Sequence, residues 1–257
     1  GSKYYVGQHG NNYFTIRYVY PRIEEQTSDK FLTWGWNNNF SKYIPMFIFN
    51  TAGVKNNYDK NGGLLLIERP QASRRFPWDV HADFYNYFKE QTSFVSKLSP
   101  EPMQKLTIRL SKAKNNKKLN EVSRWLDFNK SIKIDDGNTV LNDLIAESRL
   151  VIHSYDTTGF LENLSLNIPT MVFWQNGFDH LRESVRPDYK MLVDAGLIHL
   201  SSKSISKKVN EVWNNVDQWW SQKKVQDAKV MFCNKYAKNS KNPTKSLISF
   251  FRQNDNY

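Results

Sequence analysis

Hydroxyl side chains follow an apolar run in the middle of the chain, within VIHSYDTTGFLENLSLNIPTMVFW at residues 151–174. The pattern predicts a strand, a turn containing Ser154, Thr157 and Thr158, a helix over about residues 160–167, and a second strand. A helix N-terminus presents unpaired backbone N–H groups and a positive dipole end, which favour a phosphate. The stretch therefore predicts one side of a phosphate site, although the same threonines would serve equally well as helix caps.

Charged side chains at five further positions suit the same kind of ligand. Glu162 lies one turn into the predicted helix, where it would accept hydrogen bonds from a ribose or complete the cap. Arg69, Arg74 and Arg75 lie in ERPQASRRFPWD, and guanidinium groups pair bidentately with phosphate or carboxylate. Arg109 ends a predicted buried strand, a position that favours the ligand edge over the core. The alternative for the arginine loop is a solvated basic segment.

His9 stands in GQHG, at the end of a strand predicted over residues 4–8. Histidine changes charge near neutral pH, so His9 is a candidate general base, with a structural histidine as the alternative. His153 and His180 show no metal-ligand spacing with Asp, Glu or Cys, and the chain has no HExxH, DxD or GxGxxG motif. We therefore expect neither a metal nor another cofactor.

Composition indicates a globular protein with an uneven positive charge. The chain has 257 residues, 39% hydrophobic residues, one cysteine and a net charge of +11. No apolar run reaches membrane-spanning length, and the single cysteine fits the cytosol. From residue 203 to 257, 11 Lys and Arg stand against 4 Asp and Glu. Such a surface would suit nucleic acid, an anionic membrane, a polyanionic acceptor or solubility alone.

From Gly62 onward, short apolar runs alternate with amphipathic stretches. This alternation predicts an α/β fold with a doubly wound, Rossmann-like parallel sheet followed by C-terminal helices. The first sixty residues contain two strand patterns and no convincing helix, so we expect them to be the tail of another domain. The expected division is 1–60, 61–202 and 203–257, with Trp213 and one of Trp219 and Trp220 facing the core.

Three segments together resemble GT-B-type transferases of bacterial surface polysaccharides and O-antigens. They are GQHGNNY at 7–13, SDKFLTWGW at 28–36 and HSYDTTGFLENLSLNIPT at 153–170. The resemblance covers residue 4 to about residue 200. It identifies 1–60 as the remnant of an acceptor-side domain, 61–202 as the nucleotide-binding GT-B C-terminal domain, and 203–257 as a basic helical segment.

The chain is more distantly similar to the CDP-glycerol glycerophosphotransferases of teichoic acid synthesis. His9-Gly10 corresponds to their His-Gly-Thr loop, Thr157-Thr158 to their paired serines, and Glu162 to their helical aspartate. The chain departs from that pattern at Asn11, where the loop has threonine, and at Ser111-Lys112, where a His-Pro pair often follows the second strand. Because of these two departures, the similarity does not by itself identify the donor.

The resemblance implies a metal-independent transferase in which His9 activates the acceptor, while Arg109, Thr157, Thr158 and Glu162 contact a nucleotide-sugar donor. Our preferred donor is a CMP-linked nonulosonate or Kdo, whose carboxylate would use the arginine loop. The implied acceptor is a glycan or glycolipid. We expect a cytoplasmic protein, at the inner face of the membrane if the basic C-terminal helices contact lipid. The alternatives are a CDP-alcohol phosphotransferase and a non-catalytic basic binding module. Specific nucleic-acid binding is not expected, because no RNA-binding signature is present.

Overall fold

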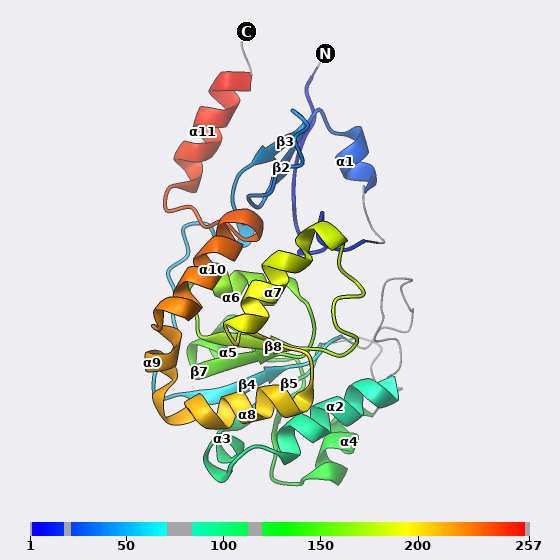
Figure 1. The fold of residues 1–257 in the computed structure, drawn as a ribbon, viewed down its shortest axis with the longest axis vertical. Helices are drawn as coiled ribbons and strands as arrows, with labels where there is room; N and C mark the ends of the chain where they lie inside the picture. Colours follow the sequence, from blue (N-terminus) through cyan, green and yellow to red (C-terminus); the bar gives the residue numbers. More distant parts are fainter. Residues whose placement is uncertain (1, 18–21, 71–83, 113–119, 255–257) are drawn as a thin grey trace.

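The computed structural model describes residues 2–17, 22–70, 84–112 and 120–254, which form two parallel β-sheets with helices around them (Figure 1). The smaller sheet has the order β1-β2-β3, with β1 at Tyr5–Gly7, β2 at Lys30–Thr33 and β3 at Tyr43–Pro45. Helix α1 (Ile23–Thr27) lies between β1 and β2 in sequence. The expectation of two strands and no helix in this part was wrong, because β3 and α1 are too short for their periodicity to show.

The larger sheet has six parallel strands in the order β6-β5-β4-β7-β8-β9. The strands are β4 (Gly63–Ile67), β5 (Leu106–Arg109), β6 (Lys133–Asp135), β7 (Ser148–His153), β8 (Thr170–Phe173) and β9 (Ile198–His199). The strand order reverses direction between β4 and β7. This confirms the expected doubly wound, Rossmann-like sheet, in which ligands bind beyond the carboxyl ends of the strands near the reversal.

Both faces of the six-stranded sheet are covered, so its central strands are apolar throughout. Leu64 and Leu66 of β4 belong to one core cluster, and Leu65 and Ile67 belong to a second cluster on the opposite face. This alternation follows from the two-residue period of a strand. The covering helices are α2 (Phe84–Ser96), α3 (Pro100–Gln104), α4 (Glu121–Phe128), α5 (Leu141–Ala146), α6 (Thr158–Ser165) and α7 (Arg186–Asp194). The sequence pattern predicts a helix over residues 79–97; α2 is its described part, and residues 79–83 lie outside the described residues.

The C-terminal helices divide between the two sheets. They are α8 (Ser202–Val212), α9 (Val216–Trp220), α10 (Lys223–Tyr236) and α11 (Pro243–Asn254). Helix α8 packs against α2 and β8, whereas α11 returns to the three-stranded sheet, where Phe250 packs with Leu32 and Met46 (Figure 1). The chain therefore passes between the sheets twice.

Three tryptophans of the C-terminal segment lie in the core. Trp213, Trp219 and Trp220 are 3%, 3% and 4% exposed, so both members of the Trp219–Trp220 pair are buried rather than one. Their indoles are therefore unavailable for the membrane contact that aromatic and lysine interleaving would offer. No helix in the described residues is long and apolar enough to cross a bilayer.

Candidate active site

The loop after β1 meets the loop between β7 and α6 at the carboxyl edge of the six-stranded sheet. The Asn11 backbone N–H donates a hydrogen bond to Thr158 Oγ1 at 3.1 Å, and the Asn11 side-chain amide donates to Asp156 Oδ1 at 3.0 Å. These contacts bring the loop that carries the expected base, His9, next to the N-terminus of α6. The structure therefore joins two of the three sequence motifs directly.

Asp156 is the centre of this junction. Its Oδ2 accepts hydrogen bonds from His180 Nε2 at 3.1 Å and from Tyr189 Oη on α7 at 3.2 Å, and its side chain is only 7% exposed. The carboxylate thus links the His9 loop, β7 and the segment before α7. Our sequence reasoning did not select Asp156, although a carboxylate three residues after a buried strand carries a signal similar to the one that selected Arg109.

Gln8 connects the third motif, SDKFLTWGW at 28–36, to the site. Its Oε1 accepts hydrogen bonds from the Trp34 backbone N–H at 3.0 Å and from Trp36 Nε1 at 2.7 Å, and its Nε2 donates to the Gly10 carbonyl at 2.8 Å. The residue is 3% exposed. The backbone on both sides of His9 is therefore fixed by the SDKFLTWGW segment, which explains why the two motifs occur together.

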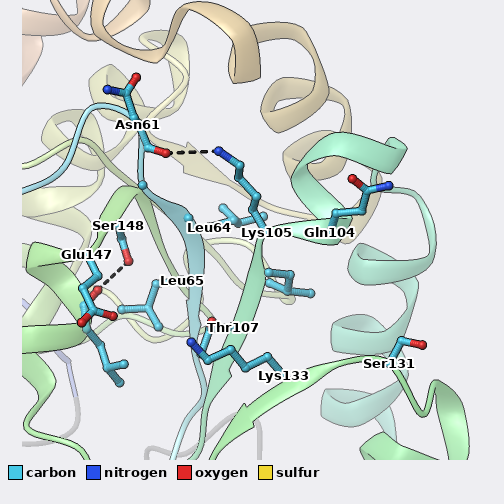
Figure 2. A pocket seen from close by; sticks show the side chains of 14 residues that line it. Asn61, Leu64, Leu65, Gln104, Lys105, Thr107, Ser131, Lys133, Glu147 and Ser148 are labelled. Atoms are coloured by element: carbon cyan, nitrogen blue, oxygen red, sulfur yellow. Dashed lines mark hydrogen bonds between the residues drawn. The ribbon is translucent and has the colours of Figure 1, made fainter.

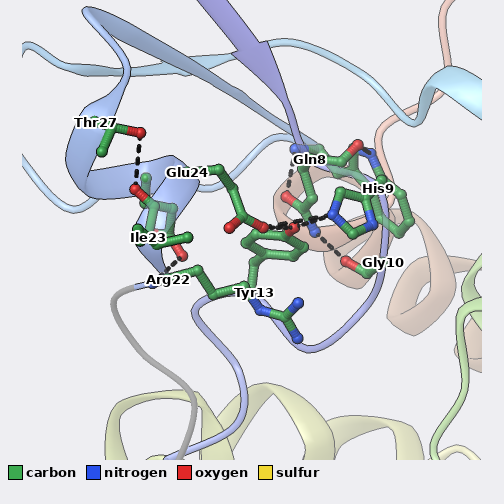
Figure 3. A network of polar contacts seen from close by, with 10 residues as sticks. Gln8, His9, Gly10, Tyr13, Arg22, Ile23, Glu24 and Thr27 are labelled. Atoms are coloured by element: carbon green, nitrogen blue, oxygen red, sulfur yellow. Dashed lines mark hydrogen bonds and ion pairs between the residues drawn. The ribbon is translucent and has the colours of Figure 1, made fainter.

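His9 itself extends from this fixed backbone toward solvent, with its side chain 67% exposed. Its Nε2 contacts the Tyr13 hydroxyl, and that hydroxyl donates a hydrogen bond to Glu24 Oε1 at 2.5 Å (Figure 3). Burial raises the pKa of Tyr13 far above its usual value, and the hydrogen bond from Tyr13 lowers the pKa of Glu24. The arrangement near neutral pH is a protonated phenol between an imidazole and a carboxylate.

Thr157 and Thr158 begin α6. Thr157 Oγ1 accepts a hydrogen bond from the Gly159 N–H at 3.3 Å, so Thr157 is the N-cap, and Thr158 Oγ1 is engaged by Asn11. The capping interpretation is thus confirmed for Thr157, while contact with a donor phosphate stays a proposal for both. Gly159 permits close packing here, since a Cβ atom would lie 3.0 Å from His153 Cε1.

Ser154 lies beneath this loop. Its hydroxyl donates to the Ile67 carbonyl at 3.0 Å and lies 2.6 Å from the Tyr87 hydroxyl, and the residue is 2% exposed. Because the single hydroxyl proton is already committed to a backbone carbonyl, the position favours a structural role for Ser154 over contact with a donor.

Glu162 lines a cavity of about 400 Å³ bounded by α5, α6 and the 50–57 connection. Asn50 donates to Glu162 Oε1 at 2.9 Å, and burial raises the pKa of this carboxyl. His153 lies at the same cavity and is 1% exposed; burial lowers its pKa to about 3, so its imidazole is neutral. The cavity combines a few polar groups with an apolar wall formed by Ile145 and Ile168 among others, as small-molecule sites do.

Of the four arginines expected to bind an anion, Arg69 and Arg109 lie among the described residues. Arg69 follows β4, and its guanidinium lies 4.7 Å from the centre of the Tyr87 ring. Arg109 ends β5 at the carboxyl edge, as expected, but it pairs with Asp135. Burial pushes the pKa of Asp135 up, yet hydrogen bonds from Thr139 and Arg109 outweigh it and lower that pKa, so the Arg109 charge is already compensated. Arg74 and Arg75 lie outside the described residues.

A second hollow, of about 360 Å³, lies at the opposite edge of the sheet (Figure 2). It is lined by the amino ends of β4, β5 and β6, including Asn61, Lys105 and Lys133. In doubly wound sheets the amino edge is not the ligand edge, so we assign no site there. Among residues 2–17, 22–70, 84–112 and 120–254, no group of three His, Cys, Asp or Glu side chains has the geometry of a metal site.

A known protein family matches nearly the whole chain. The family model described as LIC12162 family transferase matches residues 1–251. The chain belongs to the LIC12162 family of transferases. The curated proteins include no match to this LIC12162 family transferase.

Two of the solved structures that match illustrate the fold of this LIC12162 family transferase. The wall teichoic acid polymerase TagF, soaked with CDPG, aligns with a TM-score of 0.50 and 12% identity over 90% of this chain and 58% of TagF. MnaA from S. aureus, in a structure with UDP, aligns with a TM-score of 0.53 and 12% identity over 90% of this chain and 63% of MnaA. The chain thus spans roughly three fifths of the length of these structures. At this identity the likeness shows the fold alone.

Proposed function

We propose that this LIC12162 family transferase is a glycosyltransferase of bacterial surface-polysaccharide biosynthesis, with His9 as general base and a nucleotide-activated sugar as donor. The observation that supports this most is the pair of hydrogen bonds from Asn11 to Thr158 and Asp156. They join the loop carrying an exposed imidazole to a helix N-terminus at the carboxyl edge of a Rossmann-like sheet. The proposed base and the proposed phosphate-binding element therefore lie on neighbouring segments.

The proposed reaction balances without a redox partner. His9 takes the proton of the acceptor hydroxyl, the acceptor oxygen forms a bond to the sugar carbon, and the electron pair of the breaking C–O bond leaves with the donor phosphate. Negative charge develops on that phosphate. The N-terminus of α6 and the arginines after β4 would stabilise it, which is why the proposal needs no metal.

The cavity beside Glu162 is the proposed nucleotide subsite. A ribose hydroxyl would displace Asn50 from Glu162, and Ile145 and Ile168 offer an apolar surface to the nucleoside. Our preferred donor remains a CMP-linked nonulosonate or Kdo, because its carboxylate gives Arg69 a second anionic partner. We also propose a glycan or glycolipid acceptor, a cytoplasmic location near the inner face of the membrane, and the division at residues 60 and 202.

A nucleotide panel tests the donor. Thermal unfolding with CMP, CDP, UDP, GDP and ADP should show stabilisation by cytidine nucleotides, about 5–10 °C at one hundred times Kd. Glu162→Gln should reduce this shift. Glu211→Gln, which alters a 60% exposed carboxylate on α8, is the matched control and should leave it intact. A preference for UDP would refute the cytidine assignment.

Substitution of the base tests the mechanism. His9→Ala should lower kcat by about 100-fold or more, because positioned general bases contribute about 10²–10⁴-fold. Nucleotide binding should stay within about twofold of wild type, since His9 lies on the loop from β1 and not on the helix that meets the donor. Turnover like that of wild type would remove His9 from the mechanism.

A CDP-alcohol phosphotransferase is the second candidate. It is supported by the correspondence of His9-Gly10, Thr157-Thr158 and Glu162 with the glycerophosphotransferase pattern, and TagF was soaked with CDPG. Product analysis separates the two reactions. A glycosyltransferase releases CMP from a CMP-sugar or CDP from a CDP-sugar with all phosphates on the nucleotide, whereas the phosphotransferase releases CMP from CDP-glycerol and transfers one phosphate to the product.

A further inference from the structure

The contact between His9 and Tyr13 is part of a three-residue chain that ends on α1. Tyr13 is 1% exposed, and its hydroxyl lies between His9 Nε2 and Glu24 Oε1 (Figure 3). Glu24 Oε1 also lies 3.5 Å from His9 Nε2. The His9 and Tyr13 rings meet edge-on, with centroids 5.2 Å apart and an interplanar angle of 81°. The imidazole therefore has one nitrogen directed into a built polar network.

The number of protons in this network decides which imidazole nitrogen can act. A phenol has one proton, and Tyr13 donates it to Glu24, which is a carboxylate and can only accept. The Tyr13 oxygen can then only accept a hydrogen bond from His9, so Nε2 carries a hydrogen. The lone pair of the neutral ring is left on Nδ1.

The geometry points to Tyr13 and Glu24 as positioning residues that hold the His9 proton on Nε2 and make Nδ1 the base. This inference rests on the proposed function for the role of the base, but the proton arrangement itself does not. When the acceptor O–H bond breaks, a new N–H bond forms at Nδ1 and the ring becomes an imidazolium. The Glu24 charge, 3.5 Å from Nε2, stabilises that cation through the Tyr13 hydroxyl.

The surroundings hold the Tyr13 ring and the backbone beside His9 in place. The Arg22 guanidinium lies 4.4 Å from the centre of the Tyr13 ring, and Phe31 of β2 packs on the ring at 5.3 Å between centroids. Gln8 fixes the backbone next to His9 through Trp34 and Gly10. The Tyr13 side chain cannot turn away without breaking these contacts, which is what a positioning role requires.

Nitrogen-15 NMR of the chain tests the inference without any substrate. His9, assigned by comparison with His9→Ala, should show a hydrogen on Nε2 and a bare Nδ1 at pH 8. Its Nε2–H signal should be protected from exchange with water although the side chain is 67% exposed. Tyr13→Phe and Glu24→Gln should each abolish this protection. Tyr236→Phe is the matched control, since Tyr236 is 1% exposed and donates to Asp188 at 2.6 Å, and it should leave the signal unchanged.

Two NMR results would overturn the inference: a hydrogen on His9 Nδ1 in the wild type, or a protected Nε2–H that survives in both variants. With CMP-N-acetylneuraminate or CDP-glycerol as donor, each variant should lower kcat about 10- to 100-fold with KM within about threefold. The double variant should lose little more, because the residues act as one unit. If His9→Ala retains turnover while the NMR result holds, the proposed base fails and the proton arrangement stands.

Discussion

Replacing Gln8 by methionine would test whether one buried amide organises the His9 loop. Methionine matches glutamine in length but can neither accept nor donate a strong hydrogen bond. Gln8→Met would leave the Trp34 backbone N–H and the Trp36 indole N–H without their acceptor, and the Gly10 carbonyl without its donor. Trp34 and Trp36 are 0% and 1% exposed, so water cannot replace the lost partner.

The magnitude follows from the two buried donors. Each orphaned N–H costs about 1–3 kcal/mol, which gives about 2–6 kcal/mol before the greater hydrophobicity of methionine offsets a part. We expect a net loss of about 3 kcal/mol in the free energy of unfolding. For a chain of this size that corresponds to a fall in Tm of about 6–12 °C.

Urea unfolding followed by tryptophan fluorescence provides the assay, and Gln91→Met provides a matched control. Gln91 on α2 is 0% exposed, and neither side-chain amide atom has a hydrogen-bond partner among the described residues. Its replacement should therefore be neutral or stabilising. A Gln8→Met loss below about 1 kcal/mol, or equal losses for both variants, would refute the role assigned to the Gln8 hydrogen bonds.

Two further predictions concern buried carboxyl groups. Burial raises the pKa of Glu68 to about 8, so between the ordinary glutamate value and pH 8 the folded state holds a proton that the unfolded state has released. The free energy of unfolding should then fall by about 1.4 kcal/mol per pH unit as pH rises, and Glu68→Gln should remove this slope; parallel urea-derived profiles for both proteins over pH 5–8 would contradict it. Asp156→Asn should lower the free energy of unfolding by about 2 kcal/mol, because an amide cannot accept from Asn11, His180 and Tyr189 together. Thermal unfolding measures this loss, and Asp194→Asn, which alters an exposed ion pair with Lys190, should change the free energy of unfolding by less than about 1 kcal/mol.

The six-stranded sheet was predictable because its strands carry their own signal. β4, β7 and β8 are short apolar runs buried on both faces, and the stretches between them contain helices with clear periodicity. The sequence pattern predicts strands at 64–68, 105–110, 131–134, 150–153, 170–174 and 197–200, and each of them occurs with its bounds shifted by at most two residues. Burial of an entire strand is visible in a single sequence because it excludes polar residues from every position.

The elements that were missed are those whose place is set by distant parts of the chain. β3 has three residues and ends at Pro45, and α1 has five residues, so neither shows a period. Trp219 and Trp220 are adjacent and would point to different sides of a long helix, but α9 is a single turn enclosed by its neighbours. The residue pattern of a short segment does not show which distant parts of the chain will bury it.

The candidate site was predictable as a set of residues but not as a network. The positions of Thr157 and Glu162 followed from a strand-turn-helix pattern, and that of His9 from the end of a strand. Asn11 and Asp156 are 145 residues apart, and Gln8 and Trp36 are 28 apart. Side-chain amides and carboxylates carry no local signature of such partners, so only the folded structure shows them.

The double passage of the chain between its two sheets has a mechanical consequence. One passage runs through η1 (Phe49–Thr51) to residue 62, and the other runs from α10 to α11 through residues 237–242. Both passages connect parts that already share one hydrophobic core cluster, to which Phe31 of β2 and Leu64 of β4 both belong, so packing as well as the two connections resists separation of the sheets. Lys3 contacts the Asn254 carbonyl, so the first and last described parts of the chain lie together beside the three-stranded sheet (Figure 1).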